Sequence, residues 1–210
     1  METMQPVAPM VLAGPHVRLE PLTLAHIPGL VDASTNGSRQ TFGWTYVPVD
    51  EAGMRRYVEI ALGDRHTVAF ATVAGGRVVG STRFCNIEHW DWLPGSPQQR
   101  ARGYADAAEI GWTWLAPDAQ RTAVNTEAKL LMLGHAFEAW EVRRVTLKTD
   151  YRNARSRAAI ERLGAKLDGL LRAQLPAVDD TPRTSAVYSI LPEEWPEIRA
   201  RLEQRLQRAT

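Results

Sequence analysis

The segment from Glu109 to Ala128 contains the residues of this sequence that are best suited to binding a phosphate. Its first part, EIGWTWLAP, is typical of a strand that ends at Pro117, and the part that follows is typical of the start of a helix. The first turn of a helix leaves unpaired N–H groups and a partial positive charge, and both stabilise a phosphate. Arg121 adds a full charge, and Thr122 and Thr126 add hydroxyl donors. We interpret this segment as a candidate diphosphate site.

The same residues also allow a purely structural interpretation. Asn125 or Thr126 could cap an ordinary helix, and Glu127 in the first turn would interact favourably with the helix dipole. The residues of this segment alone leave both interpretations open.

The elements that must position this segment indicate a mixed α/β or α+β protein. Leu130, Leu133, Phe137 and Trp140 recur with the spacing of one helical face. Ala74-Gly75-Gly76 joins two apolar runs as a hairpin turn would. The expected strands are 17–22, 67–73, 77–87, 107–115, 145–149, 165–171 and 184–191, and the expected helices are 24–33, 51–62, one through 130–140, one from 153 to 164 and one from 192 onward. Runs of strands mixed with a βαβ unit are typical of such a sheet protein.

Composition places the chain among soluble single-domain proteins. Its 210 residues suffice for one mixed domain, expected over 15–210 after a loosely held lead-in at 1–14. A net charge of +1 gives no field that would attract nucleic acid or an anionic membrane. The single cysteine, Cys85, excludes an internal disulfide and a cysteine-rich metal site, and it lies in an apolar run that predicts burial. We expect a cytoplasmic protein that uses no metal.

Four separated segments of the sequence together resemble one protein family. They are EIGWTWLAP, TEAKLLMLGHAFE, RRVTLKTDYRNARSRAAIERLGAKLDG and AVYSILPEEW, and they cover about half of the chain. In this order they resemble the GNAT superfamily of acyl-CoA-dependent N-acyltransferases, in particular the branch that acetylates N-terminal amines of ribosomal proteins. The resemblance implies a central, mostly antiparallel sheet of about seven strands with one splayed pair and helices on both faces. It also implies acetyl-CoA as co-substrate and a primary amine as acceptor. The apolar stripe of the last expected helix, Trp195, Ile198 and Leu202, could pack on the same domain or on a second subunit, and this leaves a homodimer possible.

The resemblance also assigns the residues that would bind acetyl-CoA. Backbone groups of Thr113, Trp114 and Leu115 would contact pantetheine and the thioester oxygen, and Asn153 would hydrogen-bond pantetheine, although Asn153 could also be a helix cap alone. The diphosphate would lie against Gln120, Arg121, Thr122, Ala123, Val124, Asn125 and Thr126. The family pattern in this loop is Gln/Arg-x-x-Gly-x-Gly/Ala. Here Ala123 and Asn125 stand where the pattern has its last two small residues, which affects the details of the contact with phosphate.

Direct attack of an amine on a thioester needs a neutral amine and a proton for the leaving thiolate. By resemblance, Ser156 would supply that proton, with Tyr151 as a weaker substitute. Glu109 would accept the amine proton through a water. An N-terminal amine has a solution pKa not far above neutral, so a dedicated base is dispensable for such a substrate.

The acceptor pocket is expected from two segments, 40–49 and 88–106. Their aromatic side chains would form one wall against the acceptor: Phe42, Trp44, Tyr46, Trp90 and Trp92. A small-molecule amine such as an antibiotic, a polyamine or an amino-acid derivative is an alternative acceptor. A non-catalytic CoA-binding module is an alternative of another class, since Ala123 and Asn125 replace loop glycines.

Overall fold

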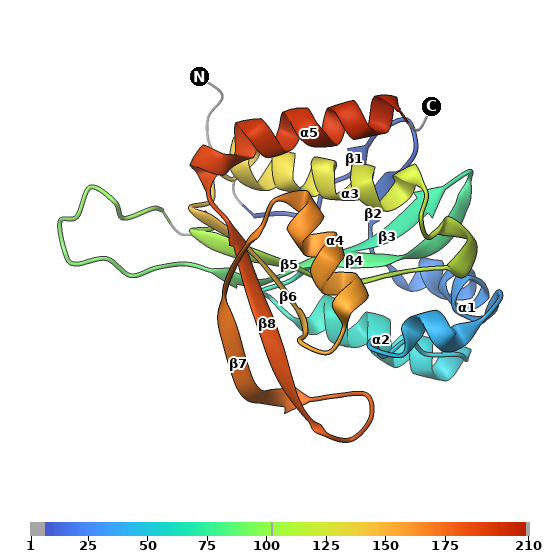
Figure 1. Cartoon of the computed structure of the whole chain (residues 1–210). Helices are drawn as coiled ribbons and strands as arrows, with labels where there is room; N and C mark the ends of the chain where they lie inside the picture. Colours follow the sequence, from blue (N-terminus) through green and yellow to red (C-terminus); the bar gives the residue numbers. More distant parts are fainter. Residues whose placement is uncertain (1–6, 102, 209–210) are drawn as a thin grey trace.

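A computed structural model describes residues 7–101 and 103–208. The described strands form one mixed sheet in the order β1-β2-β3-β4-β5-β6-β8-β7 (Figure 1). The strands are β1 (Leu12–Ala13), β2 (Arg18–Pro21), β3 (Val68–Ala74), β4 (Arg77–Glu88), β5 (Ala107–Leu115), β6 (Arg144–Asp150), β7 (Lys166–Pro176) and β8 (Pro182–Ile190). Every neighbouring pair is antiparallel except β5 and β6, which are parallel. The predicted sheet architecture is confirmed, with the short β1 as an eighth strand.

Helices cover both faces of the sheet, and each face has its own hydrophobic core. One face, called the α2 face here, carries α1 (Ile27–Thr35) and α2 (Glu51–Gly63). The other, called the α3 face, carries α3 (Ala123–Gly134), α4 (Ala154–Leu163) and α5 (Trp195–Gln207) (Figure 1). The α5 residues Trp195, Ile198 and Leu202 are buried, and α5 packs along α3 of the same chain. This answers a question that the sequence left open, namely what covers the apolar stripe of the last helix.

Local sequence signals account for most element boundaries. Asp50 Oδ1 accepts a hydrogen bond from Gly53 N (2.7 Å) and so caps α2. Asn153 Oδ1 accepts from Ser156 N (3.0 Å) and caps α4, which ends at the left-handed Gly164 (φ 99°). The turn between β3 and β4 uses Gly75 and Gly76, both with positive φ, as predicted.

The pairing of β5 with β6 stops early, and this positions the site. Only Ala107, Ala108 and Glu109 of β5 pair with β6, opposite Arg144, Val145 and Thr146. Beyond these residues β5 continues to Leu115 and β6 to Asp150 without further pairing between them. One edge of β5 therefore keeps unpaired backbone groups after Glu109. The splayed strand pair is confirmed.

A bulge in β5 faces β4 at the same level. Arg83 of β4 lies opposite Gly111 and Ser81 lies opposite Trp114, so β5 has one residue more than β4 between these pairs. Trp112, within the bulge, has the left-handed φ of 52°. A bulge changes the direction of a side chain and leaves a backbone group out of the ladder. Here Trp112 turns to the α2 face, whereas Thr113 turns to the α3 face.

Several expected segments differ in the structure. Residues 40–49, for which neither a strand nor a helix is expected, are irregular: Ser38 caps the 3-10 turn Arg39–Phe42, and Gly43 and Pro48 interrupt an extended run. Residues 1–6 of the expected lead-in lie outside the described residues. In its remainder, β1 pairs with β2, and Met10 and Leu12 pack against the core. The helix after Thr122 continues beyond Gly134 as a π-helical turn, His135–Ala139.

Candidate functional site

The start of α3 lies directly after the unpaired end of β5. Thr122 caps α3, and its hydroxyl accepts a hydrogen bond from Val124 N (3.3 Å). Arg121 has a left-handed φ of 62°, and its side chain is exposed. The backbone thus turns abruptly before the helix and presents the N–H groups of its first turn. This is the local geometry that binds phosphate in many proteins.

Gln120 closes the space between β5 and α4. Its Nε2 donates to Leu115 O (2.8 Å), and its Oε1 accepts from Arg155 Nη2 (3.1 Å). Arg155 is exposed in the first turn of α4, and its bond to Gln120 brings a second cation to the residue that precedes Arg121. Sequence reasoning missed Arg155, because only the fold brings the start of α4 to the start of α3.

The departures from the family's loop pattern cause no backbone strain. Ala123 and Asn125 both lie inside α3, and the left-handed residue of the loop is Arg121 instead. Asn125 Oδ1 is buried without a hydrogen-bond partner among the described residues. The O and N atoms of such an amide are interchangeable by rotation, so the unpartnered position can present an N–H donor. The residues at this helix start therefore fit an anionic group.

Not every predicted phosphate contact reaches the site by its side chain. Val124 and Thr126 are buried on the core side of α3, so only their N–H groups lie at the helix start. Glu127 is also buried, and its Oε2 accepts from His16 N (2.6 Å) and Val17 N (2.7 Å). Glu127 thus fixes the chain before β2, a role that the sequence did not reveal.

A buried lysine supports the bulge from the α3 face. Lys129 Nζ donates to Thr113 Oγ1 (2.7 Å) and to Thr82 Oγ1 (3.3 Å), and these two hydroxyls lie 2.7 Å apart. Burial lowers the pKa of Lys129 to about 7, and no carboxylate of the described residues pairs with it. The side chain of Thr113 is therefore engaged by Lys129, which leaves its backbone for a ligand.

Asn153 and Ser156 lie together at the start of α4. Because Asn153 Oδ1 accepts from Ser156 N, the side chain of Asn153 is a helix cap, and its Nδ2 remains for another partner. The half-buried Ser156 hydroxyl makes no hydrogen bond to a described residue. Tyr151 is 45% exposed just before α4.

Glu109 stands where β5 and β6 separate, and it is already paired. Its Oε2 lies 2.8 Å from Lys148 Nζ and also accepts from Asn86 Nδ2 (2.8 Å). A Cβ at Gly111 would come within 3.1 Å of Glu109 Oε1 and 3.2 Å of Cys85 Sγ, so these side chains share the α2 face. Burial, together with the nearby Glu109 carboxylate, raises the pKa of the Cys85 thiol to about 12. Cys85 is thus buried, as predicted, and its thiol is neutral.

The predicted aromatic wall is divided between two ends of the sheet. Trp44 lies against Arg152 at the end of β6, with the guanidinium carbon 4.9 Å from the ring centroid. Trp90 lies against Arg144 at the start of β6, at 5.9 Å. These positions on β6 are about 20 Å apart at the usual rise of a strand. The structure therefore does not bring Trp90 and Trp92 together with the segment 40–49.

The segment 39–50 lines a pocket on the α2 face. This open pocket has a volume of about 330 Å³ and is lined by Arg39, Thr45, Tyr46, Val47, Pro48, Val49, Asp50, Gly53, Arg56 and Val178. Tyr46 is 59% exposed there, whereas Phe42 is buried and packs edge-on against Trp114. Phe42 thus supports this wall from the core.

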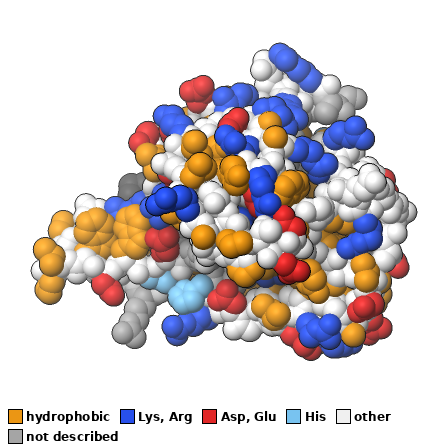
Figure 2. Space-filling model, turned by 60° about the horizontal axis from the view of Figure 1, so that its bottom comes forward, with side chains coloured by type: hydrophobic (Ala, Val, Ile, Leu, Met, Phe, Trp, Pro, Cys, Tyr) orange, Lys and Arg blue, Asp and Glu red, His pale blue; other side chains and the backbone are white. Residues whose placement is uncertain are grey.

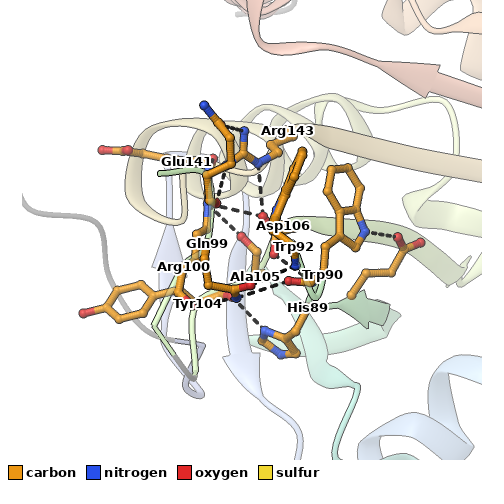
Figure 3. A network of polar contacts seen from close by, with 12 residues as sticks. His89, Trp90, Trp92, Gln99, Arg100, Tyr104, Ala105, Asp106, Glu141 and Arg143 are labelled. Carbon is orange, nitrogen blue, oxygen red and sulfur yellow. Dashed lines mark hydrogen bonds and ion pairs between the residues drawn. The ribbon is translucent and has the colours of Figure 1, made fainter. Parts of the chain in front are cut away.

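The loop between β4 and β5 is fixed at its base by a polar network (Figure 3). Asp106 is buried, and its carboxylate accepts from Trp90 N (2.9 Å) and from Arg143 Nε (3.1 Å). Arg100 donates to three backbone oxygens, those of Ala105, Trp140 and Glu141, at 2.7, 3.1 and 2.6 Å. The tip of this loop projects from the body, and hydrophobic side chains lie along it (Figures 1 and 2).

Two further findings concern the described residues as a whole. Among residues 7–101 and 103–208, His, Cys, Asp and Glu side chains nowhere gather in a group of three that could hold a metal ion. None of the described helices combines the length and the apolar character that crossing a membrane requires.

The family comparisons agree with this geometry. A model of the acetyltransferase (GNAT) domain matches residues 16–166. The Bacillus subtilis (strain 168) protein YdaF, provisionally named a ribosomal N-acetyltransferase, is 34% identical over 88 residues. These are 42% of this chain and 47% of YdaF, so the match spans about half the length of that relative.

Solved structures match over nearly the whole chain. A crystal structure from T. thermophilus, assigned as an acetyltransferase, is 35% identical with a TM-score of 0.79, over 95% of this chain and 98% of that one. A GCN5-related N-acetyltransferase from Brucella melitensis is 25% identical with a TM-score of 0.82, over 98% and 90%. Mycobacterium smegmatis RimJ in complex with CoA-disulfide is 22% identical with a TM-score of 0.75, over 96% and 97%, and this likeness concerns the fold.

Proposed function

The chain belongs to the GNAT acetyltransferase family, since the family's domain model matches residues 16–166 and a solved acetyltransferase is 35% identical over 95% of the chain. On this basis we propose that it transfers an acetyl group from acetyl-CoA to a primary amine, namely the N-terminal amine of a peptide or protein. The observation that carries the proposal is the early end of β5–β6 pairing beside the open start of α3.

The gap side of β5 and the start of α3 would hold acetyl-CoA. On the edge of β5 that β6 leaves unpaired, the backbone of Thr113, Trp114 and Leu115 would supply donors and acceptors for pantetheine, and Asn153 Nδ2 would join them. The first turn of α3, with Arg121 and Arg155 beside it, supplies donors and charge for the diphosphate. Binding there requires that Gln120 release the Leu115 carbonyl, which it occupies in this structure.

The reaction needs little from ionisable side chains. Acetyl-CoA supplies the activated acyl group. A backbone N–H group at the bulge, aimed at the thioester oxygen, would stabilise its developing negative charge by about 3 kcal/mol. Ser156 would donate a proton to the departing thiolate, since its hydroxyl is not committed elsewhere among the described residues. Glu109 Oε1, the oxygen not bonded to Lys148 or Asn86, would accept the amine proton through a water.

Two observations support a peptide acceptor over a small molecule. The pocket beside segment 39–50 is open to solvent and so accommodates a chain that continues outward. The names of YdaF and of a Vibrio cholerae structure that matches over 87% of this chain refer to acetylation of ribosomal proteins. An open pocket admits the first residues of a peptide without requiring that the rest of it be enclosed.

Calorimetric titration with acetyl-CoA, followed by a thiol-release assay on a panel of peptide and small amines, tests this function. Arg121→Glu should weaken acetyl-CoA binding by about tenfold or more, because it replaces attraction by repulsion at the diphosphate. Arg205→Glu, an equal charge change on the exposed side of α5, should leave the affinity unchanged. Ser156→Ala should lower turnover at least tenfold at unaltered affinity.

Three outcomes would contradict parts of this proposal. Equal affinity of wild type and Arg121→Glu would remove the diphosphate assignment. Undiminished turnover of Ser156→Ala would place the acid elsewhere. Binding of acetyl-CoA without release of thiol on any amine would favour a non-catalytic CoA-binding module.

A further inference from the structure

Arg83 is a buried arginine whose side chain has no hydrogen-bond partner among the residues that the structure describes. It lies in β4 on the α2 face, and only 4% of its surface is exposed. Its Nε is completely enclosed without a hydrogen-bond partner, and its two Nη atoms, equally unbonded among the described residues, keep slight contact with solvent. A buried charge without hydrogen bonds is costly in any fold. Such a group is retained most readily where a ligand completes it.

Two aromatic rings fix the position of this guanidinium. Its central carbon lies 4.4 Å from the Tyr57 ring centroid and 4.6 Å from that of Trp112. The two rings are 6.3 Å apart and inclined by 64°, so Arg83 sits in the corner between them. The rings stabilise the charge through their π-systems but accept no hydrogen bond in the plane of the guanidinium. The N–H donors therefore remain available.

Trp112 reaches this position through an unusual backbone. A tryptophan with a φ of 52° is in a sparsely populated region that costs free energy. The bulge of β5 imposes that conformation and turns the ring to the α2 face, against Arg83. Strain of this kind is found preferentially at binding sites.

The carboxylates near Arg83 are engaged by other groups. Asp64 is within electrostatic range, yet it accepts hydrogen bonds from His66 N (2.9 Å) and Thr67 Oγ1 (2.8 Å) and forms no ion pair with Arg83. Glu109, two positions from Gly111 on the paired strand, is bound to Lys148 and Asn86. The described protein thus offers no anion to Arg83.

A second arginine whose guanidinium makes no hydrogen bond to a described residue lies on the β6 side of the gap. Arg183 of β8 is half-buried, its Nε is enclosed without a partner, and none of its side-chain nitrogens hydrogen-bonds a described residue. Its charge interacts with Asp150 and Glu109, and burial lowers its pKa. Arg83 on β4 and Arg183 on β8 therefore lie on opposite sides of the strand pair β5–β6, and the charge of Arg183 is within electrostatic range of Glu109.

We propose that Arg83, with Arg183 opposite, binds a carboxylate that the acceptor carries close to its amine. This rests on the proposed function and narrows its substrate class to amines with a neighbouring carboxylate. An arginine edge donates two parallel hydrogen bonds to a carboxylate, and the aromatic corner holds that edge in place. The carboxylate comes either from an acidic side chain near a peptide's N-terminus or from the α-carboxylate of an amino-acid-like molecule.

The test measures binding of acetylated products, so it does not depend on turnover. One pair of probes is an N-acetylated peptide amide with glutamate at its second position and the same peptide with glutamine. The other pair is N-acetylalanine and N-acetylalaninamide. Calorimetric titration of the full chain in the presence of CoA gives the affinity ratio within each pair, and the pair that shows a preference identifies the source of the carboxylate.

Wild type should bind the carboxylate member of one pair about 10- to 100-fold more tightly, the range for hydrogen bonds to a charged group. Arg83→Met should reduce that ratio to about one, and Arg83→Lys should restore only part of it, because an ammonium lacks the paired donors. Arg183→Met should reduce the ratio in part. Arg205→Met, on exposed α5, should leave it as in wild type.

Equal or unmeasurable affinity for charged and neutral members in both pairs would overturn the proposal, as would an unchanged ratio in Arg83→Met. If Arg83→Met does not fold, the affinity ratios of Arg83→Lys and Arg183→Met are used instead, and an unchanged ratio in both variants would overturn the proposal. Thiol release on amines is scored separately. A carboxylate preference without thiol release would refute acetyl transfer and support the anion site. Thiol release without a carboxylate preference would support acetyl transfer and refute the anion site.

Discussion

Arg100 is half-buried and Arg83 is buried, and the fold provides the two arginines with different partners. Arg100, at the base of the β4–β5 loop, donates to three backbone oxygens and lies beside the buried Asp106 (Figure 3). Arg83, on the α2 face, contacts two rings and donates to no described residue. Arg100 thus has hydrogen-bond partners for its guanidinium, and Arg83 has none within the described part of the chain.

The difference separates a structural arginine from one available to a ligand. Polar groups inside a protein are nearly always hydrogen-bonded, because an unmade bond there costs more than a made bond gains. Arg100 follows this rule and joins the loop to the end of the π-helical turn through Trp140 and Glu141. Arg83, beside the splayed strands, departs from this rule because its guanidinium makes no hydrogen bond to a described residue. Replacing Arg100 by methionine should therefore lower stability and leave ligand binding intact. Replacing Arg83 by methionine should impair binding of the carboxylate and leave stability nearly unchanged.

Arg100→Met should have the largest effect on stability. It removes hydrogen bonds from three carbonyl oxygens and one of two cations beside Asp106, and should lower the free energy of unfolding by about 3 kcal/mol. Urea denaturation followed by circular dichroism measures this loss. Binding of acetyl-CoA and the carboxylate preference should persist below the unfolding transition. A loss under about 1 kcal/mol would show that the network is not a structural support.

Lys129→Met should change stability in the opposite direction. Lys129 is another buried cation, held by two hydroxyls on the α3 face, and burial lowers its pKa to about 7 from the ordinary value of 10.5. Thr82 and Thr113 would still bond each other after the substitution. We expect a gain of about 2 kcal/mol at pH 7, less than the full shift implies because hydrogen bonds to Lys129 are lost.

The pH dependence of that gain has a definite sign. Below pH 7 the lysine is protonated in the folded and the unfolded chain, so the full cost of burying its charge is present. Between pH 7 and 10.5 the unfolded chain holds a proton that the folded chain has lost, and the stability of the wild type therefore rises relative to the variant. Denaturation at about pH 7 and about pH 9.5 measures the difference. A gain that is the same at both values would contradict the titration of Lys129.

The sequence predicted the parts of this fold that depend on local patterns. The Gly75-Gly76 turn, the Asn153 cap and the left-handed Gly164 all depend on residues within one turn, and they appear as expected. The splayed pair followed from the resemblance to the family, and the pairing confirms it. Segment 40–49 carries aromatic residues at strand spacing, but Gly43 and Pro48 interrupt the run, and the structure has the 3-10 turn Arg39–Phe42 there.

The candidate site was only partly predictable, because it depends on contacts across the sheet. The bulge that turns Trp112 toward Arg83 is a mismatch between two strands, which neither strand shows alone. One signal was present: Arg83 is the only charged residue between Val78 and Ile87, in a run whose other residues predict burial. Trp90 and Trp92 were grouped with Trp44 because the sequence does not say at which end of β6 a loop lies.

Arg83→Met should have the smallest effect on stability, which would distinguish Arg83 most clearly from Arg100. The variant loses contacts of the guanidinium with Tyr57 and Trp112, which stabilise by about 1–2 kcal/mol. It also removes a buried charge without hydrogen bonds, and that removal offsets the loss. The free energy of unfolding should stay within about 1 kcal/mol of wild type, against about 3 kcal/mol lost in Arg100→Met. Parallel urea titrations of the two variants measure the contrast. Equal destabilisation would mean that Arg83 is a structural residue like Arg100, because a group kept for a ligand contributes to binding and little to folding.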